Sequence, residues 1–346
     1  MPEPDAPSQR VAVLDAPSNL GLRPPAPGRE PGARRMAATL RARGLLDLVD
    51  VMDAGAVDAP AYSPEPHADS GFRNGAGITA HTRALADRVG ELLDQRRFPV
   101  VLGGDCSIVL GPTLALRRRG RSGLVFIDAH DDYSPIRDAQ RYAGSFAAAG
   151  LDLGLATGHL APTLADIDGL GPYVREDDAV HIGLVREPED DEFARTELFA
   201  RSGVAVFPAF EIKARGPAAV LGDITALLRR PDLDGFWVHV DADVLAESVM
   251  PAVDSPNPSG LTADQLTSIL AGLVAENGCR GVEFTIYDPD LDPDGVAADV
   301  LIGIIAATVN AVPDPNGGEP QLDPKQGPSP EHANQPSPTP PKPDRT

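Results

Sequence analysis

Two acidic motifs carry the side chains of this sequence that are best suited to chemistry. Asp128, His130 and Asp132 alternate directly after one apolar segment, and side chains two apart in an extended segment share a face. Asp241 and Asp243 repeat this spacing after a second apolar segment. Four carboxylates and an imidazole in one place need positive charge between them, because like charges repel and burial disfavours them. The pattern therefore predicts a site for divalent cations.

A glycine-rich turn adds a third segment to these two motifs. Residues 99–102 are apolar and lead into Gly103 and Gly104, which permit close approach of the backbone, and then into Cys106. Taken singly, an Asp-x-Asp pair is more often a capped turn, and a histidine after a strand is usually a satisfied polar residue. Three motifs at the ends of three separate apolar segments favour a metal site over these alternatives.

The segments around the motifs predict an α/β fold. Apolar residues recur with helical period between the short apolar runs, and Thr262 and Gln265 have the spacing of a capping box. Strands alternating with helices predict a mostly parallel sheet covered on both faces, with ligands at the carboxyl ends of its strands. We expect strands in residues 99–102, 123–127, 179–185, 204–207, 236–240 and 281–286, and helices in residues 81–96, 262–277 and 300–309.

The three motifs in this order resemble those of the arginase/agmatinase (ureohydrolase) family. They read Gly-Gly-Asp-Cys-Ser at residues 103–107, Asp-Ala-His-Asp-Asp at residues 128–132 and Asp-Ala-Asp at residues 241–243. The similarity covers roughly residues 10 to 312 and marks a divergent branch, because Cys106 stands where the family has histidine. The resemblance implies a three-layer α/β/α fold with a mostly parallel central sheet and the metal site at the carboxyl ends of strands.

The resemblance also implies a reaction and a ligand set. Family members hold two divalent ions, most often Mn²⁺, and a hydroxide between the ions attacks the guanidinium carbon to release urea and an amine. Asp128, His130 and Asp241 would then be catalytic through this hydroxide. By motif, the bridging ligands are Asp128 and Asp241, one ion is completed by Cys106 and Asp132, and the other ion is completed by His130 and Asp243.

Cys106 is the first departure from the family pattern. A thiolate is softer than imidazole and has a shorter reach, so Fe, Co, Ni or Zn can replace Mn at this ion. The alternative is that Cys106 packs as a small hydrophobic residue and binds nothing.

The proton shuttle and the substrate anchor are the second and third departures. Family members supply a histidine or an acid as proton shuttle from the loop after Asp132. Here residues 133–146 contain no histidine, and Asp138 is their only carboxylate. Tyr142 is a weak proton donor or merely lines the pocket. Ile286 stands where a family glutamate pairs with the guanidinium group. Loss of that anion predicts a substrate other than plain arginine. Glu283 lies three residues upstream, on the opposite face of a strand.

Composition places further bounds on the protein. The chain has 346 residues, 42% of them hydrophobic, which suffices for one catalytic domain over residues 1–312. Residues 313–346 are rich in proline and predict a disordered tail. The net charge of −21 disfavours nucleic acid and anionic membranes as partners. Two cysteines and no apolar leader predict a reduced, cytoplasmic setting.

Two classes of function remain open on the sequence. The first is a binuclear metal hydrolase of a linear amidine or guanidino C–N bond. The second is a catalytically degenerate family member that binds metal and serves as a binding or structural subunit. A further possibility is an amide deacylase on the same metal geometry, which needs no guanidinium anchor. The resemblance also implies a small-molecule substrate and a homo-oligomer, either a trimer or a hexamer.

Overall fold

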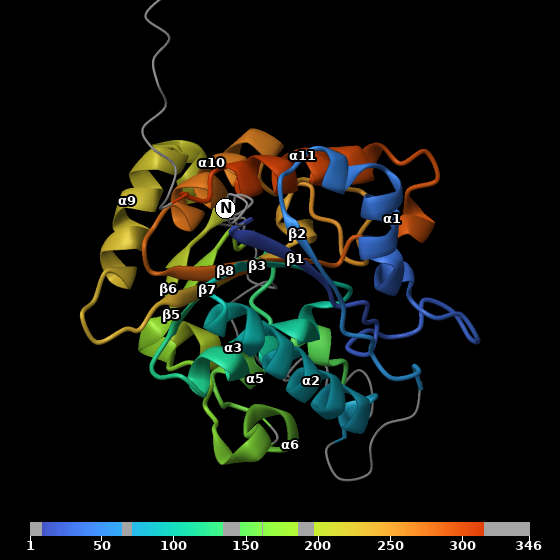
Figure 1. Ribbon diagram of the computed structural model, residues 1–346, viewed down its shortest axis with the longest axis horizontal. Coiled ribbons are helices and arrows are strands. Elements are labelled where there is room, and N and C mark those ends of the chain that lie inside the picture. Colours follow the sequence, from blue (N-terminus) through green and yellow to red (C-terminus); the bar gives the residue numbers. More distant parts are fainter. Residues whose placement is uncertain (1–8, 64–70, 134–145, 161, 186–196, 315–346) are drawn as a thin grey trace, which may run out of the picture. The chain divides into compact units, whose positions relative to one another are not determined.

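A parallel sheet of eight strands organises the described part of the chain (Figure 1). The computed structural model describes residues 9–63, 71–133, 146–160, 162–185 and 197–314. The strand order is β2-β1-β3-β8-β7-β4-β5-β6. The strands are β1 Val11–Asp15, β2 Met52–Ala56, β3 Phe98–Leu102, β4 Gly123–Ile127, β5 Ala179–Ile182, β6 Ala205–Phe207, β7 Phe236–Asp241 and β8 Cys279–Thr285.

Helices cover both faces of this sheet. The α-helices are α1 Met36–Ala42, α2 Gly75–Asp94, α3 Leu110–Arg117, α5 Asp152–Ala156, α6 Pro162–Ala165, α7 Glu197–Ala200, α8 Ala209–Arg215, α9 Pro217–Leu228, α10 Ala263–Val274 and α11 Val296–Asn310. Short 3₁₀ turns are η1 Gly32–Arg35, η2 Leu45–Asp47, η3 Cys106–Val109, η4 Ala148–Gly150, η5 Ile167–Gly169, η6 Glu176–Asp178, η8 Ala242–Val244 and η9 Pro289–Leu291. No described helix is long and apolar enough to cross a membrane.

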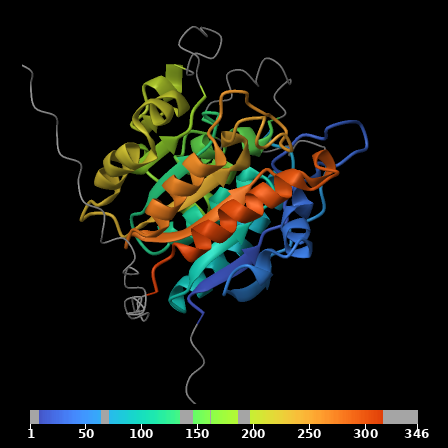
Figure 2. The ribbon, with the colours of Figure 1, turned by 90° about the horizontal axis from the view of Figure 1, so that it is seen from above.

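The two faces have separate hydrophobic cores. One core packs α1, α8, α9, α10 and α11 on the sheet, and Figure 2 shows α10 and α11 side by side over it. The other core packs α2, α3, α5 and α6 on the opposite face. Neighbouring residues of a strand point to opposite cores, so strands with two buried faces need nearly continuous apolar sequence, as β3 and β4 have.

The fold prediction is confirmed: the protein is a three-layer α/β structure, and its described strands are all parallel. Helix α10 begins at the predicted capping box, in which Thr262 Oγ1 accepts from Gln265 N at 3.2 Å and Gln265 Oε1 accepts from Thr262 N at 3.0 Å. Helix α2 begins at Gly75 rather than near residue 81, because Ile78 extends its buried face by another turn. The chain divides into two units, residues 1–313 and 314–346, and the predicted tail lies outside the described residues from residue 315 onward.

An ion-pair cluster joins the loops at the amino ends of three strands. Asp178, which has a fully buried side chain, accepts from Arg121 Nε at 2.7 Å and from Arg121 Nη2 at 2.9 Å. Arg230 donates to the same carboxylate. These three residues precede β5, β4 and β7 respectively, so the cluster lies at the sheet edge away from the predicted motifs.

Candidate metal centre

All three sequence motifs lie at the carboxyl ends of neighbouring strands. The strands β3, β8, β7 and β4 are consecutive in the sheet, and each motif follows the last residues of β3, β7 or β4. A cavity of about 350 Å³ opens at this edge. Its walls include His130, Asp132, Asp241, Asp243 and Ile286, together with Leu22, Arg23, Asp131, Ala147, Ala149, Gly150, Asp254 and Ser255.

One group of ligand-type side chains forms at this cavity from Asp128, His130 and Asp243. His130 Nδ1 lies 3.0 Å from Asp243 Oδ2 and 3.5 Å from Asp128 Oδ1. The His130 backbone N–H donates to Asp128 Oδ1 at 2.6 Å, whereas Asp128 Oδ2 is buried and has no hydrogen-bond partner among the described residues. A buried carboxylate oxygen without a donor is unfavourable unless a cation reaches it. The donor set therefore fits a divalent ion.

Electrostatics at the cavity support the same interpretation. Burial, followed by the charge of a neighbouring aspartate, raises the pKa of Asp128 and raises the pKa of Asp241 well above its usual range. Burial opposes charge on His130, but Asp243 and Asp128 outweigh it, so the pKa of His130 is raised well above its usual value. Buried carboxylates whose pKa values are raised by neighbouring negative charge gain when a cation binds between them.

Cys106 lies beneath this cavity and is fully buried. Its Sγ is 2.8 Å from Asp241 Oδ2 and 2.9 Å from Thr285 Oγ1. Burial, reinforced by the charge of Asp241, raises the pKa of the Cys106 thiol well above its usual range. The predicted proximity of Cys106 to Asp241 is therefore present, and a bound cation would be needed to make the thiol a thiolate.

The turn before Cys106 is fixed by Asp105. Its Oδ1 accepts from Ser107 N at 3.0 Å, and its Oδ2 accepts from Ser18 Oγ at 2.5 Å. Gly104 is required here, because a Cβ at this position would lie 1.7 Å from Ser18 O. Asp105 thus orients the turn that carries Cys106.

Asp132 and Asp241 belong to neither compact ligand group within the described residues. Asp132 lines the cavity with a left-handed backbone, at φ 39°. Burial and the nearby charge of Asp128 raise the pKa of Asp132 well above its usual range. Asp241 Oδ1 accepts from Asp243 N at 2.7 Å, so this carboxylate lies between the cavity group and Cys106.

The sequence analysis did not select Asp152 and His239, which lie next to Cys106. His239 is two residues before Asp241 on β7, so the alternation of a strand already placed its side chain on the face of Asp241. Asp152 gave no such signal, because its position depends on the path of the chain after β4. Glu283 lies beside His239 across the sheet, and its Oε1 is 2.9 Å from His239 Nδ1.

Two other predicted features have different outcomes. Ile286 lines the cavity with an apolar side chain at the position expected for the substrate anchor. Its backbone has φ 75°, which is unusual for a β-branched residue. Tyr142 and Asp138, the candidates for a proton shuttle, lie outside the described residues.

Comparison with known proteins settles the family. A family model described as the arginase family matches residues 9–309. The chain belongs to this family. It is 27% identical over 301 residues to an arginase of Bacillus caldovelox, covering 86% of this chain and 97% of that protein. The predicted resemblance is therefore confirmed.

Solved structures share the fold of this arginase-family chain. The Bacillus caldovelox arginase structure at pH 5.6 matches with a TM-score of 0.74 at 23% identity, covering 87% of this chain and 98% of that one. A proclavaminate amidino hydrolase from Streptomyces clavuligerus matches with a TM-score of 0.63 at 20% identity, covering 89% and 93%. At these identities the structural likeness concerns the fold.

Proposed function

We propose that the chain is a metal-dependent hydrolase of a C–N bond in a linear amidine or guanidino compound other than plain arginine. The observation that carries this proposal is the meeting of Asp128, His130 and Asp243 at a cavity, where no described residue donates to Asp128 Oδ2. Membership of the arginase family supports the reaction class. A neighbour in fold is an amidino hydrolase named for proclavaminate, so arginine is not the only compound treated by enzymes of this fold.

The chain's own residues would bind and orient two cations. Asp128, His130 and Asp243 would hold one ion at the cavity, and the Cys106 side of the centre would hold the other, with Asp132 and Asp241 as the remaining candidate ligands. The cations, when bound, supply the charge that activates water and polarises the C–N group. Backbone N–H groups of His130 and Asp243 already fix the carboxylates of Asp128 and Asp241, so little reorganisation is needed on binding.

The charge of the cavity favours a cationic substrate. Among the described residues that line it, Asp132, Asp241 and Asp243 are assigned to the cations, which leaves the carboxylates of Asp131 and Asp254 beside Arg23. Asp254 lines this cavity and the adjoining one of about 380 Å³, and Ile286 lies beside it in both. Asp254 can therefore pair with a substrate cation where Ile286 cannot, although from a different direction.

The test is turnover by the metal-loaded chain on a panel of guanidino, formimino and acylated amine compounds. We expect release of urea, ammonia or formamide from a guanidino or formimino compound. Asp243→Asn should lower kcat/KM at least about 100-fold, because losing a metal ligand reduces activity more than losing a residue that only orients a ligand. The matched control is Asp264→Asn, in the first turn of α10, which should retain full activity.

Two results contradict the proposal. Hydrolysis of acylated amines alone would identify an amide deacylase on the same metal geometry. Tight metal binding without turnover of any compound on the panel would identify a catalytically degenerate family member.

A further inference from the structure

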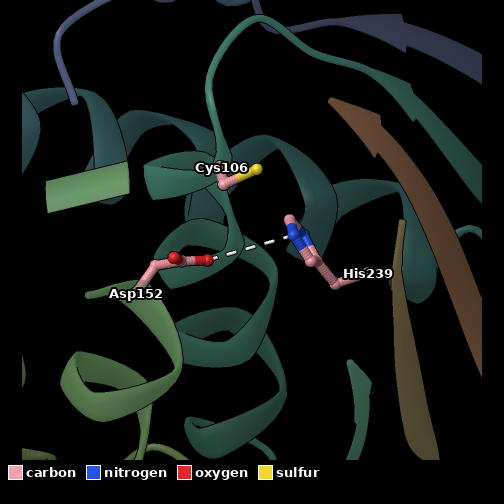
Figure 3. A group of neighbouring side chains, drawn as sticks. All are labelled: Cys106, Asp152 and His239. Atoms are coloured by element: carbon pink, nitrogen blue, oxygen red, sulfur yellow. Dashed lines mark ion pairs between the residues drawn. The ribbon is translucent and has the colours of Figure 1, made fainter. Parts of the chain in front are cut away.

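A second group of ligand-type side chains lies below the cavity, among Cys106, Asp152 and His239. Each comes from a different element: η3, the first residue of α5, and β7. Figure 3 shows the thiol, the carboxylate and the imidazole directed toward a common space. Their ligand atoms all lie within 4.8 Å of one another, and His239 Nε2 is 3.9 Å from Asp152 Oδ2. All three side chains are fully buried.

Three polar atoms of this group lack hydrogen-bond partners among the described residues. They are both carboxylate oxygens of Asp152 and Nε2 of His239. A buried carboxylate that faces an unpartnered ring nitrogen is unfavourable in an apolar interior unless a cation lies between them. The imidazole of His239 also stacks on the ring of Phe126, with 4.7 Å between the ring centroids, and this contact favours the observed orientation of the imidazole.

Glu283 gives His239 the arrangement of a metal ligand. The Glu283 carboxylate accepts from His239 Nδ1 at 2.9 Å. This bond assigns the ring proton to Nδ1 and leaves the lone pair of Nε2 directed toward Asp152 and Cys106. Histidines that bind metals usually donate their second N–H to a carboxylate in this way, which fixes the ring and raises its basicity.

The chemical types of these three ligands favour one metal ion over another. Thiolate, imidazole and carboxylate together suit Zn²⁺, whereas Mn²⁺ prefers oxygen-rich shells. Zinc ligands at about 2.0–2.3 Å in a tetrahedron are separated from one another by roughly 3.3–3.8 Å, so the present spacing needs only a small contraction. Asp241 Oδ2 lies 2.8 Å from Cys106 Sγ and is the candidate for a fourth ligand, although these two atoms would have to move apart to reach the separation of zinc ligands.

We propose that Cys106, Asp152 and His239 form a closed zinc site, with Asp241 Oδ2 as the fourth ligand and Glu283 as the residue that positions His239. The inference rests on the proposed function in assigning a second cation to the Cys106 side of the centre. It replaces the predicted partner Asp132 by Asp152 and His239 at that ion. Zinc would then be the second ion of the centre, and the group of Asp128, His130 and Asp243 would remain open to the cavity.

The first measurement uses the unaltered full-length chain. X-ray absorption at the zinc edge, on protein loaded with one equivalent of Zn²⁺, should show one sulfur at about 2.3 Å and nitrogen or oxygen ligands at about 2.0–2.1 Å. Loading with Co²⁺ should give a thiolate charge-transfer band in the near ultraviolet together with the intense visible bands of tetrahedral cobalt. Absence of sulfur from the zinc shell would overturn the proposal without any mutation.

Variants then assign the remaining ligands. The charge-transfer band should disappear in Cys106→Ser and persist in Cys279→Ser, which removes the other buried thiol of the chain. Asp152→Asn and His239→Gln should each lower zinc affinity by more than about 100-fold, and Glu283→Gln by about 10–100-fold. His81→Gln is the matched control, because this buried histidine instead contacts Val57 O.

The outcomes separate this inference from the proposed function. Unchanged zinc affinity in Asp152→Asn and His239→Gln would overturn the site, even if the chain hydrolyses an amidine. A thiolate band and tight zinc binding in a chain that turns over nothing on the panel would support the site while contradicting the hydrolase. Asp243→Asn should leave the thiolate band unchanged, because this residue belongs to the cavity group.

Discussion

At the scale of single residues, the proposed substrate depends most on Ile286. It lies just past β8 with φ 75°, and its backbone N–H donates to Gly104 O at 2.7 Å. That bond ties the end of β8 to the turn that carries Cys106. A β-branched residue in this conformation is strained by about 1–3 kcal/mol, which is typical of positions held by a functional site.

Replacement of Ile286 by glutamate should improve the hydrolysis of arginine or agmatine. A charged pair with the guanidinium group is worth about 1.5–3 kcal/mol, which corresponds to a gain of roughly 10–100-fold in kcat/KM. Steady-state kinetics of Ile286→Glu and of the neutral control Ile286→Gln measure this gain. Equal effects of the two variants would show that polarity rather than charge matters.

The unaltered chain provides a second check on the same residue. We expect poor hydrolysis of arginine, because an apolar side chain cannot orient the planar cation for attack. A kcat/KM near ~10⁵ M⁻¹s⁻¹ on arginine, within the range of a dedicated enzyme, would refute the assignment of a different substrate. Asp254 would then be the nearest candidate for the anchor.

At the scale of elements, the Asp178 cluster ties the loops before β4, β5 and β7 together. Replacing Asp178 by asparagine should lower the free energy of unfolding at pH 7 by about 2 kcal/mol, because two arginines lose a charged acceptor. Urea denaturation followed by circular dichroism measures the change. The control Asp232→Asn removes a half-exposed partner of the same arginines and should cost less than about 1 kcal/mol.

The pH dependence of this effect has a definite sign. Burial alone would raise the pKa of Asp178, but Arg121 and Arg230 outweigh it, so the pKa lies below the ordinary value of 3.8. The stabilisation is therefore complete above the pKa of the unfolded chain and is lost as the pH falls through the lower pKa of the folded chain. The free energies of unfolding of wild type and Asp178→Asn should differ by a constant amount from pH 5 to 7, and this difference should shrink below about pH 4. A gap that widens on acidification would contradict this account.

The sequence predicted some elements well and others not at all. The strand ends at Asp128 and Asp241 followed from apolar runs and spacing two, and the start of α10 followed from Thr262 and Gln265. These features are local, so local pattern suffices. Asp152 reaches Cys106 only through the long path after β4, and such tertiary placement leaves no periodic trace.

Glu283 shows a different reason for incomplete prediction. Strand alternation places Glu283 on the opposite face from Ile286, three positions later, but it does not identify the side chain that Glu283 contacts. The partner, His239, became visible only with the pairing of β7 and β8 in register. Register between strands far apart in sequence depends on the whole sheet rather than on either strand alone.

At the scale of the whole molecule, both hydrophobic cores are built from residues 11–312. Deleting residues 315–346 should therefore shift the melting temperature by less than about 2 °C, because the deletion leaves the two described cores intact. Differential scanning calorimetry of the shortened and full chains measures this shift. A drop larger than about 5 °C would show that the segment stabilises the folded unit. Light scattering of both chains would also test the predicted trimer or hexamer.

The position of β8 sets the moment at which the centre can form during synthesis. This strand is the last of the eight to leave the ribosome, yet it lies between β3 and β7. Until residue 285 emerges, the nascent chain lacks both Thr285 beside Cys106 and Glu283 beside His239, and β3 and β7 have open edges. Open strand edges can pair with other chains, so this intermediate is more prone to aggregation than the complete sheet. The Cys106 side of the centre is consequently complete only after β8 has joined the sheet.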